Sequence, residues 1–250
     1  MLEFQSHLIF PVHAVAKPGP WPKAAEHLSA TTPDGDTLRG IRIPPVVPDK
    51  SKTLVLGFGG NAWNGQDVAE YLHELYPGHE VVVFHYRGYP PSTGSPSAKA
   101  ITTDALLVYD TAVAGLKPAK VIVVGFSIGT GVAAQLAGAR QLDGLILVTP
   151  FDSLKAVAQS MYPWLPIAPL FAHEIDAAAP LRAHTLPVAI ISAERDEIVP
   201  TDRTNALRKV VPDLVFDRTI PRAGHNDIYA RSDFQEAMRT AFDLVRGRPG

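Results

Sequence analysis

The residues best suited to covalent chemistry lie in the stretch 120–140, which reads KVIVVGFSIGTGVAAQLAGAR. Ser127 is the centre of a GxSxG pattern, whose small flanking residues allow a sharp strand-to-helix turn that lifts the serine hydroxyl out of the backbone. The run 121–124 is typical of a strand buried on both faces, and residues 128–140 carry Ala, Gly and Leu at helical spacing. This setting predicts that Ser127 is a nucleophile.

A serine hydroxyl attacks only when a neighbouring base takes its proton, so a histidine must come from elsewhere in the chain. His225, in RAGHNDIY, lies in a glycine-flanked loop after the strand expected at 214–219. A parallel sheet brings such a loop to the same carboxyl edge as the serine. We interpret the other histidines, including His79 and His85, as surface or packing residues. His225 is therefore the predicted base.

The base needs a carboxylate that fixes its tautomer and stabilises its charged form. Asp196, in SAERDEIVP, comes just after the strand expected at 188–192, in a short loop closed by a proline. The resulting chain order is nucleophile, acid, base. Glu194 and Glu197 are interpreted as solvated loop charges. Asp196 is the predicted acid.

A second carboxylate competes with this assignment on position alone. Asp152, in TPFDSL, also follows an expected strand, at 144–148, and so also ends near the carboxyl edge. With Ser153 it opens the stretch 154–160, where we expect it to be a helix N-cap that accepts backbone N–H bonds. The sequence favours this structural role for Asp152.

Developing negative charge on a substrate oxygen needs two preorganised donors. The backbone N–H of Ile128, directly after the serine, is one candidate. The glycine loop GFGGNAWNG, which follows the strand expected at 53–58, would supply the other, and Asn61 N–H is the predicted donor. As a phosphate cradle this loop lacks both the GxGxxG spacing and the Lys-Ser/Thr of a P-loop, so we predict no nucleotide site.

Composition narrows the class of partner. The chain has 250 residues, 19% charged and 46% hydrophobic, with a formal net charge of -2, so no charge excess points to nucleic acid or an anionic membrane. It has no cysteine, which removes disulfides, thiolate metal sites and a cysteine nucleophile. The N-terminus has no Lys or Arg before Lys17, unlike a secretory signal, so we expect a cytoplasmic protein without a spanning helix.

The regular elements alternate from residue 53 onward, which predicts an α/β fold with a mostly parallel sheet and helices on both faces. Before them we expect an apolar, proline-interrupted arm or edge at 2–15 and an outer antiparallel strand at 37–43. Further strands are expected at 53–58, 80–86, 121–124, 144–148, 188–192 and 214–219, helices at 66–76, 103–116, 128–140, 201–210 and 233–245, and a surface loop at 87–97.

Six stretches together resemble the ABHD-type, Bem46-like branch of the α/β-hydrolase superfamily, over most of residues 50–230. They are, in order, GFGGNAWN, HYRGYPPSTGSPS, VVGFSIGTGVAA, TPFDSL, SAERDEIVP and AGHND. At this length we expect a single α/β-hydrolase domain over residues 1–250. The resemblance implies a catalytic triad of Ser127, Asp196 and His225, with Asn61 and Ile128 as oxyanion donors. Such an enzyme would hydrolyse an ester, thioester or amide without a metal or other cofactor. Relatives usually carry His-Gly before the oxyanion residue, where this chain has Gly-Gly.

The resemblance also implies that residues 149–187 are a short, cap-like insertion, too small for a large lid. Candidate substrate-binding residues are Trp63, Tyr89, Tyr162 and Trp164, and the alternative is that these rings simply pack on the sheet. The favoured function is a serine esterase acting on a small-molecule acyl substrate. A serine peptidase, an acyltransferase and a non-catalytic binding protein stay open, and the sequence does not predict the oligomeric state.

Overall fold

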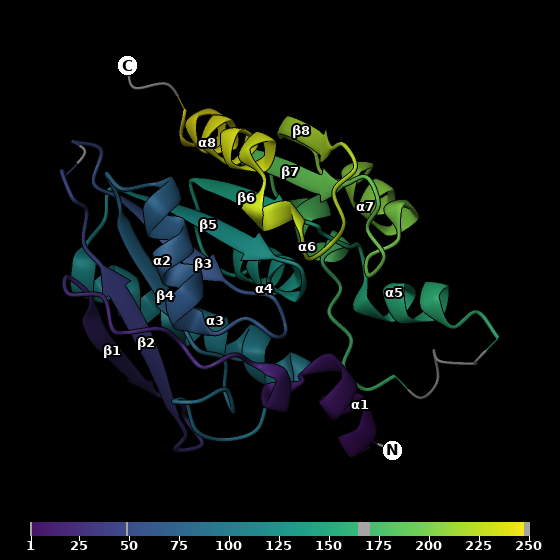
Figure 1. The fold of residues 1–250 in the computed structure, drawn as a ribbon, viewed down its shortest axis with the longest axis horizontal. Coiled ribbons are helices and arrows are strands. Elements are labelled where there is room, and N and C mark those ends of the chain that lie inside the picture. The colour runs from purple at the N-terminus through teal and green to yellow at the C-terminus, as the bar shows by residue number, and fades with distance from the viewer. Residues whose placement is uncertain (1, 49, 165–170, 248–250) are drawn as a thin grey trace.

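The computed structural model describes residues 2–48, 50–164 and 171–247, and these form one sheet flanked by helices (Figure 1). The order across the sheet is β1-β2-β4-β3-β5-β6-β7-β8. The strands are β1 (Glu26–Thr31), β2 (Thr37–Ile43), β3 (Thr53–Phe58), β4 (Glu80–Phe84), β5 (Lys120–Phe126), β6 (Gly144–Val148), β7 (Val188–Ala193) and β8 (Leu214–Ile220).

Two edge pairings, β1 with β2 and β2 with β4, are antiparallel, and the remaining pairings are parallel. The helices are α1 (Leu2–Ile9), α2 (Gly65–Leu75), α3 (Ala98–Leu116), α4 (Ile128–Ala137), α5 (Leu154–Met161), α6 (Ala178–Ala183), α7 (Thr201–Arg208) and α8 (Ser232–Arg246), with short 3-10 turns η1 (Val12–Ala14) and η3 (Ile228–Ala230).

Successive side chains of the central strands enter two separate apolar cores. In β5, Val121 and Val123 join the core beneath α3, α4, α6 and α7, whereas Ile122 and Val124 join the core beneath α2 and α8. A parallel strand is covered on both faces in this way, which is why its sequence is an unbroken apolar run. The predicted α/β fold, with a mostly parallel sheet and helices on both faces, is confirmed (Figure 1).

The N-terminal segment forms the helix α1, where we expected an apolar, proline-interrupted arm or an edge of the sheet. α1 ends before Pro11, and the oxygen of the Ser6 hydroxyl lies 2.8 Å from Nε2 of His173. Phe10 is buried, and its ring meets the His173 ring edge-on at 5.4 Å. Because His173 is 167 residues from Ser6, this helix depends on a partner that the local sequence does not reveal.

β1 was not expected, and it displaces 37–43 from the outside of the sheet. Its sequence, EHLSAT, alternates apolar and polar residues only over Leu28 to Thr31, and Ala30 is its one buried residue. The strand is instead held by the antiparallel ladder to β2, in which Glu26 pairs with Arg42 and Thr31 with Thr37. An edge strand with only two apolar residues, Leu28 and Ala30, leaves a weak hydrophobic signal in the sequence.

The loop 87–97 lies partly inside the molecule, although we expected it on the surface. The guanidinium of Arg87 donates to both carboxylate oxygens of Asp104, at 2.9 and 2.5 Å, and to Asp34 at 2.5 Å. Tyr89 is almost completely buried, with 1% of its surface exposed. Because Asp104 lies on α3 and Asp34 in the β1–β2 turn, the ion pairs fix this loop between two elements.

His85 makes folding stability depend on pH. It follows β4, is 4% exposed, and its Nδ1 accepts the N–H of Gly65 at 3.2 Å. Burial lowers the pKa of His85 to about 4. Since an exposed imidazole has a pKa of about 6.5, the unfolded chain takes up this proton first. The folded state with neutral His85 therefore has its full stability above about pH 6.5, and it loses stability relative to the unfolded chain as pH falls towards about 4.

We expect His85 to account for up to about 3 kcal/mol of the fall in unfolding free energy across that interval. Urea unfolding of the wild type and of His85→Gln at pH 7, 5.5 and 4 measures the difference. The variant should have the flatter pH dependence. The exposed His13, changed to Gln, is the control and should keep the wild-type slope. Parallel slopes for wild type and His85→Gln would contradict this account.

Candidate active site

Ser127 lies at a sharp turn between β5 and α4, as the GxSxG pattern predicts. Its backbone has φ 51°, a left-handed conformation that costs free energy for any residue but glycine. Glycine is required on both sides: a Cβ at Gly125 would lie 2.5 Å from the carbonyl oxygen of Gly129, and a Cβ at Gly129 would clash with the carbonyl oxygen of Phe58. The residues on either side of Ser127 are buried, whereas Ser127 is partly exposed. The turn therefore presents its hydroxyl to solvent.

Three loops at the carboxyl ends of β5, β7 and β8 bring Ser127, Asp196 and His225 together. Nε2 of His225 lies 2.9 Å from Oγ of Ser127, and Nδ1 lies 2.9 Å from each carboxylate oxygen of Asp196. A carboxylate accepts the Nδ1 proton, which leaves Nε2 free to accept the proton of the serine hydroxyl. The side chains of His225 and Asp196 are 6% and 5% exposed. The geometry is that of a hydroxyl paired with an oriented base.

The loop after β7 holds Asp196 firmly. Oδ1 accepts the backbone N–H groups of Ile198 at 3.0 Å and Val199 at 2.7 Å, which closes the loop back on itself. The loop is short, because β7 ends at Ala193 and α7 begins directly after Pro200. The carboxylate therefore has a rigid mount facing the imidazole.

Asp152 does not take part in this arrangement, nor is it the N-cap that we expected. Ser153 caps α5 by accepting the N–H of Ala156 at 3.1 Å. The Asp152 carboxylate faces α7 instead, where Arg203 donates to it at 3.4 Å. Burial raises the pKa of Asp152, and Arg203 opposes that shift. The Asp152 carboxylate therefore pairs with a guanidinium 51 residues further along the chain, a contact that the local sequence does not predict.

The glycine loop after β3 lies beside the serine. A Cβ on Gly60 would be 3.7 Å from Cβ of Ser127, which is ordinary van der Waals contact. The backbone N–H groups of Asn61 and Ile128 donate to no group among the described residues. Ile128 is the first residue of α4, where an N–H has no partner within the helix and the helix dipole favours negative charge. One unpartnered donor thus follows Ser127 directly in the chain, and the other follows Gly60, the glycine that packs beside it.

The four candidate substrate-binding residues do not form one pocket. Trp63 packs in an aromatic cluster beneath α2 and α8, with its ring 5.2 Å from Phe126 and 5.0 Å from Tyr229. Tyr89 belongs to the core on the opposite face and offers almost no surface to a ligand.

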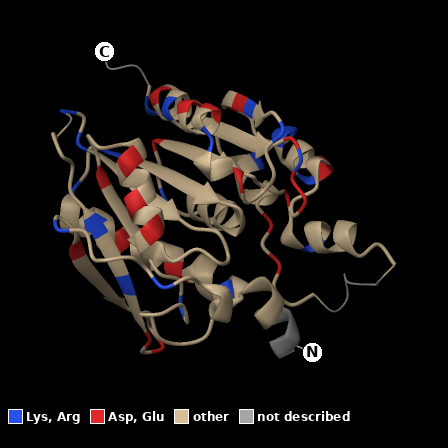
Figure 2. Ribbon diagram, in the orientation of Figure 1, with Lys and Arg blue, Asp and Glu red and all other residues tan. Residues whose placement is uncertain are grey.

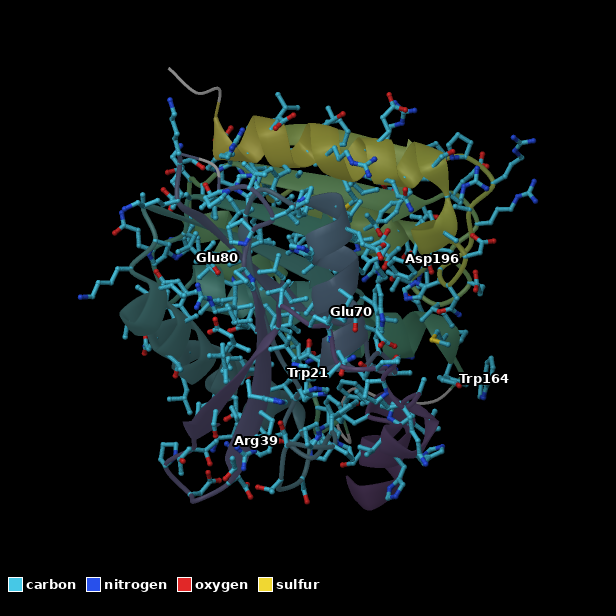
Figure 3. All side chains as sticks on the ribbon, turned by 60° about the vertical axis from the view of Figure 1, so that its left-hand side comes forward. Trp21, Arg39, Glu70, Glu80, Trp164 and Asp196 are labelled. Carbon is cyan, nitrogen blue, oxygen red and sulfur yellow. The ribbon has the colours of Figure 1, made fainter. Side chains whose placement is uncertain are left out.

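Tyr162 and Trp164, by contrast, are exposed at the end of α5, by 43% and 73% of their surfaces. Their rings meet edge-on at 5.9 Å, and Figure 3 shows Trp164 projecting from the periphery of the molecule. Neither of these rings packs on the sheet. Three further apolar residues of the same insertion that could line an acyl pocket, Leu165, Ile167 and Leu170, lie outside the described residues.

Acidic side chains hold the histidine loop, a role that the sequence interpretation did not predict for them. Glu197 accepts the backbone N–H of His225 at 3.1 Å, and Glu194 accepts that of Arg222 at 2.6 Å. Asp227 accepts the N–H of Gly224 at 2.8 Å. The two glutamates are exposed, so they are solvated as expected. The sequence signal that could have indicated this role is the position of the two glutamates, Glu194 just before Asp196 and Glu197 just after it.

The described residues hold no cluster suited to a metal ion. Within 2–48, 50–164 and 171–247, no three His, Asp or Glu side chains gather in a way that would hold a metal ion. A groove of about 510 Å³ between α6 and α7 is lined by Asp152, Arg182, Arg203 and Lys209, among others, and by none of the three residues around the serine. In the same part of the chain, no helix has the length and apolar character needed to cross a bilayer.

Comparison with known proteins agrees with this architecture. The family model of the α/β hydrolase fold matches residues 54–182. The chain is an ABHD-type member of the α/β-hydrolase family. An uncharacterized protein of Mycobacterium tuberculosis is 32% identical over 84% of this chain and 77% of its own length. Zebrafish (Danio rerio) lysophosphatidylserine lipase ABHD12 is 34% identical over 60% of this chain, but the match spans only 45% of that longer protein.

Solved structures share the fold of this α/β hydrolase. An α/β hydrolase from Vibrio vulnificus superposes with a TM-score of 0.76 at 18% identity and covers 96% of this chain and 93% of its own. The Pyrococcus furiosus esterase PF2001 superposes with a TM-score of 0.72 at 20% identity, covering 92% of this chain and 96% of its own. At these identities the likeness concerns the fold alone.

Proposed function

We propose that this α/β hydrolase is a serine hydrolase that cleaves a carboxylic ester or thioester through an acyl-enzyme intermediate. One observation carries the proposal: the line of contacts from the exposed Ser127 hydroxyl through His225 to the Asp196 carboxylate, each 2.9 Å long. A base within hydrogen-bond distance of a hydroxyl, itself oriented by a third group, is the arrangement that nucleophilic catalysis needs.

In the first half-reaction, Oγ of Ser127 attacks the carbonyl carbon, and its proton passes to Nε2 of His225. The carbonyl oxygen becomes an oxyanion, which accepts hydrogen bonds from the backbone N–H groups of Asn61 and Ile128. The tetrahedral intermediate then collapses and breaks the bond to the leaving oxygen or sulfur. His225 returns its proton to that leaving group, and the acyl group stays on Ser127.

In the second half-reaction, water replaces the alcohol or thiol. His225 takes a proton from the water as its oxygen attacks the acyl carbon, and the second oxyanion uses the same two N–H donors. Collapse breaks the bond to Oγ, which recovers the proton from His225, and the carboxylic acid leaves. Asp196 stabilises the imidazolium in both halves without itself being protonated.

The substrate that we favour is a lipid-like ester with one acyl chain. The relatives named lysophosphatidylserine lipase support it, as does the stretch 156–172, which holds no charged residue. Figure 2 shows charge interspersed over most of the ribbon but nearly absent from α5. The end of that helix exposes Met161, Tyr162 and Trp164, which would contact an apolar chain.

A single domain over 1–250 and a cytoplasmic location stay predictions, the first supported by the single eight-stranded sheet.

A panel of substrates tests this proposal. We expect the wild type to hydrolyse p-nitrophenyl esters and a lysophospholipid, with kcat/KM rising from acetyl to longer acyl chains, and to leave aminoacyl p-nitroanilides almost untouched. Tyr162→Ala combined with Trp164→Ala should weaken the preference for longer chains without lowering turnover of the acetyl ester. Amide cleavage without ester cleavage would instead indicate a peptidase. Failure to turn over any ester would contradict the proposal.

A further inference from the structure

Three successive backbone carbonyls in the loop beside Ser127, those of Gly59, Gly60 and Asn61, each accept a hydrogen bond. The Tyr86 hydroxyl donates to the carbonyl oxygen of Gly59 at 2.8 Å, and the Tyr89 hydroxyl donates to that of Asn61 at 2.7 Å. Between them, the N–H of Trp63 donates to the carbonyl oxygen of Gly60 at 3.3 Å. Three successive peptide groups are therefore fixed in orientation.

The middle peptide group is the one that matters for an oxyanion. It joins Gly60 to Asn61, so it carries the Asn61 N–H, which no described residue accepts. In a trans peptide the C=O and N–H point in opposite directions. Since the Gly60 carbonyl is directed at Trp63, the Asn61 N–H is directed the other way. Fixing the peptides on either side prevents this group from rotating.

We propose that Tyr86 and Tyr89 are positioning residues for the oxyanion donor, which they hold by bonding the carbonyls on both sides of the Gly60–Asn61 peptide. The inference rests on the proposed hydrolase function and adds to it. In a free glycine loop the N–H would have to be oriented during the reaction, whereas a braced loop offers it already oriented. Donors that are fixed in advance stabilise a transition state most effectively.

The two hydroxyls suit this role because their own surroundings are fixed. Burial raises the pKa of both tyrosines, so each keeps its proton and stays a donor throughout the working pH range. Their rings meet edge-on at 5.8 Å. Arg87 lies between them in sequence and is tied to Asp104 and Asp34, which holds the segment that carries both rings. The loop 87–97 is thus anchored by Arg87 and, through Tyr89, holds the glycine loop beside Ser127.

Removal of one hydroxyl by Tyr→Phe should misplace the donor rather than delete it. We therefore expect kcat for a p-nitrophenyl ester to fall about tenfold in Tyr89→Phe and in Tyr86→Phe, with KM changed by less than about twofold. Loss of transition-state stabilisation alone produces this split between kcat and KM. Inhibition by a trifluoromethyl ketone, which forms a tetrahedral adduct with the serine, should weaken by the same factor as kcat.

Tyr76→Phe is the matched control. Tyr76 is also buried, and its hydroxyl donates to the carbonyl oxygen of Met238 at 3.0 Å, on α8. Tyr76→Phe should lose about as much thermal stability as Tyr86→Phe and Tyr89→Phe, but it should keep the wild-type kcat and the wild-type affinity for the ketone. A purely structural role for Tyr86 and Tyr89 would make them behave like this control.

The outcomes separate the inference from the proposed function. If the wild type turns over esters and the two variants match Tyr76→Phe in kcat and in ketone affinity, the positioning role is wrong and the hydrolase proposal stands. If the wild type turns over no ester and does not bind the ketone, the hydrolase proposal itself fails, and this inference fails with it. A kcat loss matched by weaker ketone binding, at unchanged KM, supports the inference.

Discussion

Replacement of Ser127 by alanine should lower kcat for an ester by about a thousandfold or more while the protein stays folded. The hydroxyl is the group that would form the acyl bond, and its removal leaves only the oxyanion donors and substrate binding. Little packing is lost, because Oγ is partly exposed and its partner is Nε2 of His225 at 2.9 Å. Steady-state kinetics and far-UV circular dichroism of purified protein measure both parts of the expectation.

The strained backbone at this position gives a second readout. With φ 51°, Ser127 adopts a conformation that glycine reaches without steric cost, so Ser127→Gly should melt several degrees above Ser127→Ala. Ser97→Ala is the control: it removes a serine hydroxyl that caps α3 through the N–H of Ala100, so it should lower the melting temperature and leave kcat unchanged. Ordinary turnover by Ser127→Ala would end the assignment.

Asp196→Asn should lower kcat by up to about ten-thousandfold without unfolding the protein. The carboxamide would present an N–H₂ group or a carbonyl to Nδ1 of His225, which removes the preference for the tautomer with a proton on Nδ1. With the proton on Nε2, the imidazole donates to Oγ of Ser127 and no longer accepts its proton. The expected loss is therefore in kcat, and stopped-flow measurement of acylation locates it in the first half-reaction.

Asp152→Asn is the matched control for this experiment. Both residues follow strands at the same edge of the sheet, but the Asp152 carboxylate meets Arg203 at 3.4 Å and not His225. The control should keep normal kcat and change the melting temperature by only a few degrees. A severe catalytic loss in Asp152→Asn, beside near-normal turnover in Asp196→Asn, would transfer the role of the acid to Asp152.

The residues that the sequence could identify are those whose surroundings are local. Ser127 is marked by glycines two residues away on either side and by an apolar strand directly before it. His225 and Asp196 follow strands of the same sheet, and the topology of a parallel sheet brings the ends of those strands to one edge. Short-range patterns and one topological rule were enough to place these three side chains together.

The features that sequence reasoning missed depend on contacts between distant segments. α1 is held by His173, and Arg87 by Asp104 and Asp34, and neither contact has a local signature. The interpretation of Tyr89 as a pocket residue followed from its type, whereas its hydroxyl bonds a carbonyl 28 residues away. An aromatic residue in a Pro- and Gly-rich loop suggests exposure, and only the packed structure shows this ring to be buried.

The central claim, that Ser127 is an activated nucleophile, is tested most directly by intact-mass measurement after reaction with a fluorophosphonate. Such a probe phosphonylates a serine whose proton a neighbouring base removes. The account predicts one adduct per wild-type chain, mapped to the peptide that contains Ser127, no adduct on Ser127→Ala, and much slower labelling of His225→Ala. An adduct that forms on Ser127→Ala at the wild-type rate, or that maps to another residue in the wild type, would contradict it.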